Sequence, residues 1–209
     1  MKISAIARQQ KRSDRYSVFV DGKYTFSLSE SALIESKLAQ GQELTAAELK
    51  RLKQLAGENK LYNQTLRWVA YKSRTEWEAD FYLTRKHFAS TKLRQDILNK
   101  LKQVGLLDDH QYVASFISDR TLLKPTSKRK ITMELRRKHI DQELIAGALA
   151  QVSDDAEEAA LISVIERKRR TSTGRYKDDL KLMQYLARQG FNYEDIKSAL
   201  KKIKQEEIV

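Results

Sequence analysis

The sequence predicts a mainly α-helical protein: three tandem three-helix repeats in an elongated, curved array, preceded by a small N-terminal β-hairpin or sheet with two short helices. Three observations predict it. Apolar residues recur at helical spacing from about residue 58 nearly to the end of the chain. Three segments of that region share one apolar register, and a fixed period of this kind marks a repeat architecture. The 209 residues include only one proline and seven glycines, which favours long helices with short connections.

The N-terminal segment has a strand-like pattern instead. Residues 2–8, 16–20 and 24–28 are strand-like, with apolar side chains alternating at the period of a β-strand. Asp21 and Gly22 lie between two of these runs and form a dipeptide typical of tight hairpin turns. A sheet of two or three strands is marginal alone, so we expect the following segment to pack on it.

That following segment predicts the two short helices. One runs through residues 31–38 and ends before Gly41. The other starts at Thr45 and ends near Gly57; Thr45 and Glu48 have the spacing of a capping box, in which each residue satisfies a backbone amide of the other.

The repeats are defined by an apolar register shared by residues 75–101, 129–149 and 178–200. The spacing is 52 residues from Leu83 to Leu135 and 51 from Leu135 to Leu186. The same register continues five, ten and fourteen residues further on, at Phe88, Ile140 and Phe191, then Leu93, Ile145 and Ile196, then Ile97, Leu149 and Leu200.

Each repeat has room for one more helix upstream, at 61–73, 109–124 and 154–170. Each unit is therefore expected to hold three helices. The predicted organisation is an N-terminal module at 1–57 and repeats at 58–107, 108–152 and 153–209.

The link between the second and third helix of each unit is short. In the third unit Gly190 lies where a left-handed helix terminator is expected. His87 and His139 occupy the equivalent place in the first two, and His adopts this conformation at some cost relative to Gly.

The charge of the chain points to an anionic partner. Lys and Arg number 40 against 28 Asp and Glu, for a net charge of +12, and a basic excess of this size favours polyanions such as nucleic acid or an acidic protein surface. The alternative is a protein that is simply basic.

The cations gather at the junction between the first and second helix of the second and third units. Stacked units would repeat this junction on one side and form a positive stripe suited to phosphate backbones. The alternative is two solvated loops with cations that favour a helix dipole. The predicted DNA- or filament-binding residues are Arg120, Lys124, Lys128, Arg129, Lys130, Arg136, Arg137, Lys138, Arg167, Lys168, Arg169, Arg170, Arg175 and Lys177.

Catalytic patterns are weak in this sequence. There is no cysteine, no Gly-rich phosphate loop and no His-Glu-x-x-His motif. The adjacent acids Asp108 and Asp109 could hold a metal but fit better as the cap and first-turn acid of the following helix. We therefore expect no catalytic residue, no cofactor and no metal ion. The absence of cysteine, of a secretory signal and of a long apolar span predicts a cytoplasmic protein with no membrane contact.

Several runs carry a family resemblance. RTEWEADFYLTRKHF, VGLLDDHQYVASFISDR, KRKITMELRRKHIDQELIAGAL and YLARQGFNYEDIKSAL, in this order, resemble the RecX family of recombinase regulators over roughly residues 60–203. The Gly-Leu-Leu-Asp-Asp box at 105–109, with Tyr112, Phe116 and Arg120 behind it, is its most specific part. The family usually has Gly where this chain has His87 and His139.

The resemblance implies a role that the residue patterns alone do not. RecX proteins bind the RecA recombinase, chiefly as a filament on single-stranded DNA, and inhibit strand exchange, ATP hydrolysis and coprotease activity. The implied protein is a monomer that docks in the filament groove and modulates DNA repair, recombination and the SOS response. Its implied partners are RecA and single-stranded DNA, with duplex DNA as a further candidate. The alternative is a stand-alone DNA-binding regulatory or architectural protein.

Overall fold

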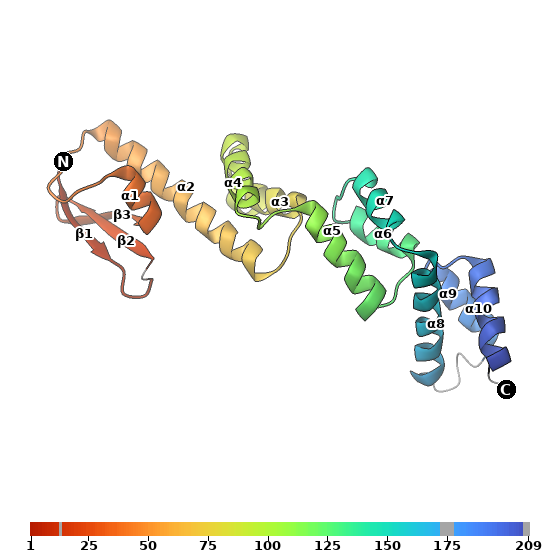
Figure 1. The fold of residues 1–209 in the computed structure, drawn as a ribbon. Helices are drawn as coiled ribbons and strands as arrows, with labels where there is room; N and C mark the ends of the chain where they lie inside the picture. Colours follow the sequence, from red (N-terminus) through yellow and green to blue (C-terminus); the bar gives the residue numbers. More distant parts are fainter. Residues whose placement is uncertain (13, 172–177, 207–209) are drawn as a thin grey trace. The chain divides into compact units, whose positions relative to one another are not determined.

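The computed structural model describes residues 1–12, 14–171 and 178–206 and is mainly helical (Figure 1). Its strands and helices follow the predicted order. The elements are β1 Ile3–Arg8, β2 Arg15–Val20, β3 Lys23–Ser29, α1 Glu30–Ser36, α2 Ala46–Tyr71, α3 Glu76–His87, α4 Thr91–Gln103, α5 Asp109–Ser118, the π-helical turn η1 Asp119–Leu123, α6 Lys128–Arg136, α7 Gln142–Ala150, α8 Asp154–Thr171, α9 Asp179–Arg188 and α10 Tyr193–Glu206.

The predicted N-terminal sheet is confirmed as three antiparallel strands in the order β1-β2-β3. The turn between β2 and β3 is formed by Asp21 and Gly22, both at positive φ (48° and 78°), the conformation that a type I′ hairpin turn requires. Val18 and Leu28 are fully buried, and the apolar face of the sheet packs with residues of α1 and the first half of α2. The sheet thus obtains the packing partner that it needs.

Helix α2 begins as predicted and ends later than predicted. The Thr45 hydroxyl accepts from the Glu48 amide (3.2 Å) and the Glu48 carboxylate accepts from the Thr45 amide (2.8 Å), so the capping box is confirmed. The predicted end near Gly57 is wrong, because Gly57 is not at positive φ and one interior glycine costs a helix only about 1 kcal/mol. The helix continues to Tyr71 and absorbs the separate helix expected at 61–73; the boundary expected after residue 57 falls inside it.

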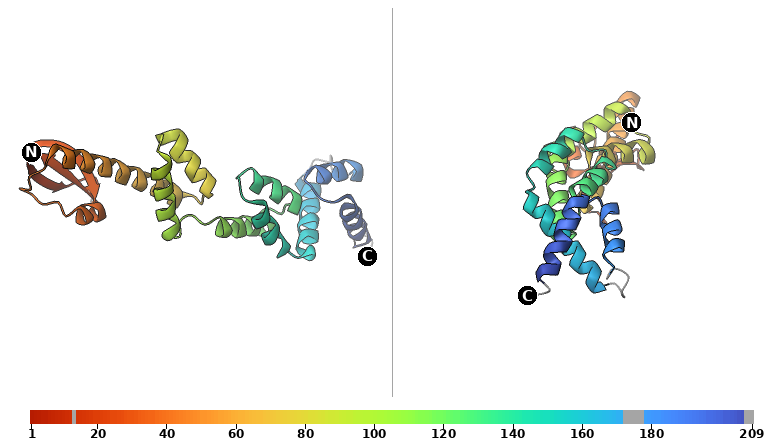
Figure 2. Two further views of the ribbon diagram at one scale, coloured as in Figure 1. Left: turned by 90° about the horizontal axis from the view of Figure 1, so that it is seen from above. Right: turned by 90° about the vertical axis from the view of Figure 1, so that its right-hand side faces the viewer.

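By its contacts the chain divides into two compact units. The first holds residues 1–73 and 79–106, and the second holds residues 74–78 and 107–209. The second repeat (α5, η1, α6 and α7) and the third (α8, α9 and α10, grouped in Figure 2) lie in the second unit. No helix among the described residues is both long enough and apolar enough to cross a membrane.

The shared register corresponds mostly to buried positions; Phe88, which is 87% exposed, is an exception. Leu83, Leu135 and Leu186 have no exposed surface. Ile140 and Phe191 are buried five residues further on, and Ile97 and Leu200 are buried fourteen residues on. The second and third repeats each enclose an apolar cluster built on these residues. The period therefore records one packing pattern used in successive repeats.

The corners between second and third helices follow the prediction in two repeats. His139 (φ 57°) and Gly190 (φ 91°) are left-handed, and the His139 ring stacks on Trp77 at 3.8 Å. The assignment of His87 to this position is wrong: the left-handed residue of the first repeat is Phe88 (φ 49°), whose side chain is 87% exposed. The corner there is one residue longer, since the Ala89 amide reaches back to the Leu83 carbonyl (3.2 Å).

The first helix of the second repeat changes geometry before it ends. The α-helical part stops at Ser118, and residues Asp119–Leu123 form the π-helical turn η1. The Lys124 amide closes this turn on the Asp119 carbonyl (2.9 Å). Leu122 and Leu123 are left 74% exposed, beside the predicted cationic residues.

Candidate functional site

A cationic cleft lies within the second unit, between the second and third repeats. Its volume is about 400 Å³. Arg120, Lys124, Lys130 and Arg167 line it together with Tyr185 and neutral residues; Glu134 is the only acid among the lining residues that the structure describes. Four predicted stripe residues, drawn from η1, the linker after it, α6 and α8, therefore come together around one hollow.

Arg120 is held in place by two contacts. Its Nε donates to Glu134 Oε2 at 2.8 Å, and its guanidinium lies 4.4 Å from the centroid of the Phe116 ring. The Arg120 side chain is only 25% exposed. The Glu134 carboxylate compensates part of the positive charge of Arg120. The carboxylate and the Phe116 ring also fix the position of the guanidinium, so Arg120 forms part of the wall of the cleft in addition to contributing charge.

The start of α6 is fixed to the third repeat. The buried Ser127 hydroxyl accepts from the Lys130 amide (3.2 Å) and donates to the Gln189 carbonyl (2.7 Å). Lys130 Nζ donates to the Gln189 side chain, and the Lys128 amide donates to Glu157 Oε1 (3.0 Å). Lys128 Nζ lies 3.8 Å from Glu157 Oε2. Lys128 and Lys130 thus join the repeats in addition to carrying charge, whereas Arg129 between them is exposed.

The other end of α6 carries Arg136, Arg137 and Lys138, which the structure does not bring to this cleft. A helix of nine residues separates its ends by about 12 Å. Arg136 Nε donates to the Gln142 side chain at 2.6 Å, while Arg137 is exposed. Lys138 Nζ pairs with Glu78 Oε1 at 2.5 Å.

The pairing with Lys138 controls the ionisation of Glu78. Burial alone would raise the pKa of Glu78, but the hydrogen bond from Lys138, the backbone hydrogen bond from Thr75 and the charges of Lys138 and Arg74 outweigh it. The pKa of Glu78 is therefore lowered, and the carboxylate stays ionised.

The cations of α8 differ in their exposure. Lys168 Nζ lies 4.6 Å from the Tyr185 ring centroid, and Arg169 Nη2 pairs with Asp179 Oδ1 at 3.1 Å. Arg167 and Arg170 are exposed. The predicted residues Arg175 and Lys177 lie outside the described residues.

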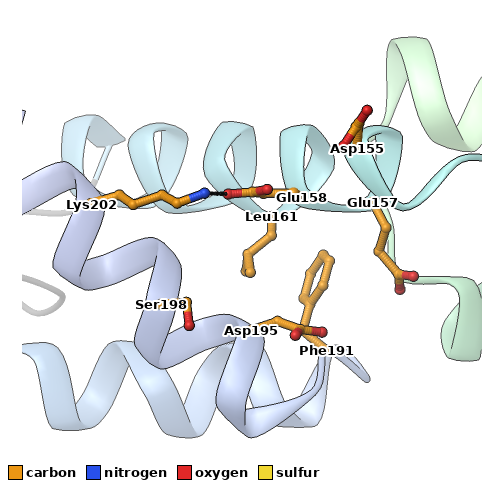
Figure 3. A pocket seen from close by; sticks show the side chains of 8 residues that line it. All are labelled: Asp155, Glu157, Glu158, Leu161, Phe191, Asp195, Ser198 and Lys202. Atoms are coloured by element: carbon orange, nitrogen blue, oxygen red, sulfur yellow. Dashed lines mark hydrogen bonds and ion pairs between the residues drawn. The ribbon is translucent and has the colours of Figure 1, made fainter.

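An acidic pocket in the third repeat was not expected from the sequence. Figure 3 shows it between α8 and α10, with Leu161 and Phe191 between the two helices; its volume is about 440 Å³. Lys202 Nζ pairs with Glu158 Oε1 there. The sequence signal for this pocket is the acid-rich start of α8. The cap of this helix is the Ser153 hydroxyl, which accepts from the Ala156 amide (3.2 Å). The acidic lining residues are Asp155, Glu157, Glu158 and Asp195.

The fold and these clefts define a class: a helical-repeat protein with a small N-terminal sheet and with surface hollows of opposite charge. Comparisons with known proteins agree. Residues 1–45 match the RecX N-terminal domain, 108–149 the second RecX three-helix domain and 155–200 the third.

Whole-chain relatives carry the same name. A regulatory protein RecX from Listeria monocytogenes is 30% identical over 203 residues, covering 95% of this chain and 74% of the relative. The RecX of Bacillus subtilis is 26% identical over 208 residues, covering 98% of this chain and 78% of the relative. The chain belongs to the RecX family of regulatory proteins.

Solved structures support the fold. A crystal structure of a regulatory protein RecX has a TM-score of 0.72 at 28% identity and covers 96% of this chain and 98% of its own. The RecX of Lactobacillus salivarius has a TM-score of 0.60 at 25% identity and covers 71% of this chain and 97% of its own.

Proposed function

We propose that this protein is a negative regulator of RecA that binds the RecA filament on single-stranded DNA, in the filament groove, and inhibits its recombinase, ATPase and coprotease activities. It acts in the cytoplasm as a monomer, by stoichiometric binding and without catalysis, and so modulates repair and recombination. Membership of the RecX family supports the regulatory role. The cationic cleft supports an anionic component in the partner.

The cleft is the observation that carries the DNA part of this proposal. Arg120, Lys124, Lys130 and Arg167 surround a hollow whose described lining includes a single acid, Glu134. Such a concentration of positive charge attracts a phosphate backbone without regard to base sequence, as a filament modulator requires. Exposed Arg129, Arg137 and Arg170 extend the positive surface around the ends of α6 and α8.

Titration of RecA ATPase on single-stranded DNA tests the proposal. Filament binding predicts inhibition at protein-to-DNA ratios far below those that saturate the DNA itself. Inhibition that appears only as the DNA becomes saturated would instead support the stand-alone DNA-binding alternative, which the same cations favour.

A charge variant localises the contact. Lys124→Gln with Arg167→Gln removes two exposed cations of the cleft lining, and we expect it to weaken inhibition. Lys201→Gln with Arg188→Gln removes the same charge from α10 and α9, outside the cleft lining, and is the matched control. Equal inhibition by both variants would exclude the cleft region from the interface.

A further inference from the structure

A second cationic cleft lies in the first unit, where the sheet meets α2. Its volume is about 450 Å³, and it opens to the surface. Arg12, Arg15, Lys53 and Lys60 line it, and no carboxylate occurs among its described lining residues. The predicted stripe includes none of these cations.

Arg15 is the buried member of this group. It is only 4% exposed, and its Nη2 donates to the carbonyl (3.0 Å) and the hydroxyl (2.8 Å) of Ser27, both neutral acceptors. Burial lowers the pKa of Arg15, the charge of Arg12 lowers it further, and Asp14 acts in the opposite direction. A fixed, poorly hydrated guanidinium close to a second one creates a site that gains from an incoming anion.

Helix α2 forms one side of the cleft, and this side has an open space at Gly57. Lys53, Gly57 and Lys60 are spaced to share one helix face, and all three are exposed. Gly57 has no positive φ, and a Cβ built on it would have no atom within 4 Å. Neither backbone conformation nor packing therefore requires this glycine, although glycine disfavours a helix interior. Its effect is to leave room for a ligand against the helix backbone between two lysines.

Tyr24 provides an aromatic surface at the same cleft. It lies on β3, is 58% exposed, and contacts Phe19 edge-on at a centroid distance of 6.0 Å. A groove that combines cations with an exposed ring suits a single nucleic-acid strand, because the cations meet phosphates while a base stacks on the ring.

We propose that this cleft is a second binding site for single-stranded DNA, separate from the stripe of the second unit. Arg12, Lys53 and Lys60 contact successive phosphates of the strand. Arg15 supplies a fixed positive charge at the base of the cleft, and one base of the strand stacks on Tyr24. The open form of the cleft allows a strand to pass through it. Binding here needs no recombinase, so it can be measured independently of the filament proposal.

The test uses the full chain, a labelled oligo-dT strand and a series of salt concentrations. Lys53→Gln with Lys60→Gln removes two phosphate contacts, so the salt slope of binding should fall by about 1.4 units, at about 0.7 per contact on a single strand. Lys50→Gln with Lys72→Gln, which removes the same charge from α2 and from the residue that follows it, outside the cleft lining, should leave the slope nearly unchanged. Equal slopes for the two variants would overturn the proposal.

Two further variants separate binding from folding. Gly57→Leu fills the open space at Gly57, so it should weaken oligo-dT binding. Because Leu is a better helix former than Gly, the variant should keep or raise the thermal midpoint of unfolding. Tyr24→Ala should weaken binding by about fivefold or more. Unchanged binding in both variants would contradict the site. Polyglutamate that bound the wild type more tightly than oligo-dT of equal charge, and lost this advantage in the Lys53/Lys60 variant, would assign the cleft to an acidic protein and overturn the assignment to DNA.

Discussion

Thr75 and Ser127 make the same pair of hydrogen bonds at equivalent positions of successive repeats. Each hydroxyl accepts from an amide of its own helix, Glu78 or Lys130, at 3.2 Å. Thr75 donates to the Lys138 carbonyl at 3.1 Å and Ser127 to the Gln189 carbonyl at 2.7 Å. Both residues are fully buried and lie in the second unit.

The equivalence extends to the next residue. The Glu76 amide donates to Asp109 Oδ1 (2.9 Å), and the Lys128 amide donates to Glu157 Oε1 (3.0 Å). Each helix N-terminus is therefore completed partly by its own cap and partly by the following repeat. These hydrogen bonds between successive repeats, here called the polar joint, recur together with the apolar register.

Ser127→Ala should destabilise the protein by about 2–3 kcal/mol. The substitution removes a helix cap and leaves the Gln189 carbonyl without its buried donor. Urea unfolding followed by circular dichroism measures the change. Ser115→Ala, at an exposed position of α5, is the control and should change stability by less than about 0.5 kcal/mol. A loss no larger than that of the control would show that the joint is energetically unimportant.

Gly190→Ala should cost more than about 1 kcal/mol. Gly190 has a φ of 91°, and an added Cβ would lie 2.7 Å from Ser127 Oγ and 3.3 Å from Arg129 Cβ. Gly147→Ala, within α7 and with nothing within 4 Å, should instead stabilise the helix by about 0.5–1 kcal/mol. Combining Gly190→Ala with Ser127→Ala should cost less than the sum, because the hydroxyl that the Cβ would strike is gone. Strict additivity would contradict this contact.

Glu78 should contribute to the acid sensitivity of folding. Its folded pKa lies below the usual 4.5, so its contribution is present at neutral pH and is lost as the pH falls below about 4.5 through the folded value. Glu78→Gln should lower stability at neutral pH by about 1 kcal/mol, and its difference from the wild type should shrink in acid. Thermal midpoints at several pH values provide the measurement. Glu166→Gln, at an exposed site on α8, is the control; a Glu78 difference that persisted in acid would refute the linkage.

Arg120→Gln and Arg137→Gln should separate structural cations from exposed ones. Loss of the Glu134 pair and the Phe116 contact should cost Arg120→Gln about 1 kcal/mol, or roughly 2–4 °C in Tm. Arg137→Gln should leave Tm unchanged and reduce only the salt slope of DNA binding, by about 0.7 on a single strand. A Tm unaffected by Arg120→Gln would mean that its contacts add no stability.

Periodicity and turn chemistry made most of the fold predictable. The Asp21-Gly22 turn, the Thr45 cap and the buried leucine register each depend on local residue chemistry, which the sequence displays directly. The two errors, at Gly57 and His87, have a common cause. Residue type permits a backbone conformation without requiring it. Gly57 can therefore remain helical, and the longer corner of the first repeat places the left-handed conformation at Phe88.

The candidate site was predictable only in part. The sequence located the cations, and four of them line one cleft. It could not distinguish exposed Arg129 from Lys130, which contacts Gln189, because that contact joins residues far apart in the chain. The acidic pocket and the N-terminal cleft were missed for the same reason, since each combines side chains from separate elements.

Because α2 is one uninterrupted helix, its length sets the angle between the helix face that contacts the sheet and the face that contacts α4. This one helix contacts β3 near its start and α4 further along, all within the first unit (Figure 1). One residue inserted after Gly57 would rotate the α4-contacting end by about 100° relative to the sheet, whereas seven would nearly restore the angle and displace that end by about 10 Å. Length variation in this helix is therefore expected in steps of whole turns.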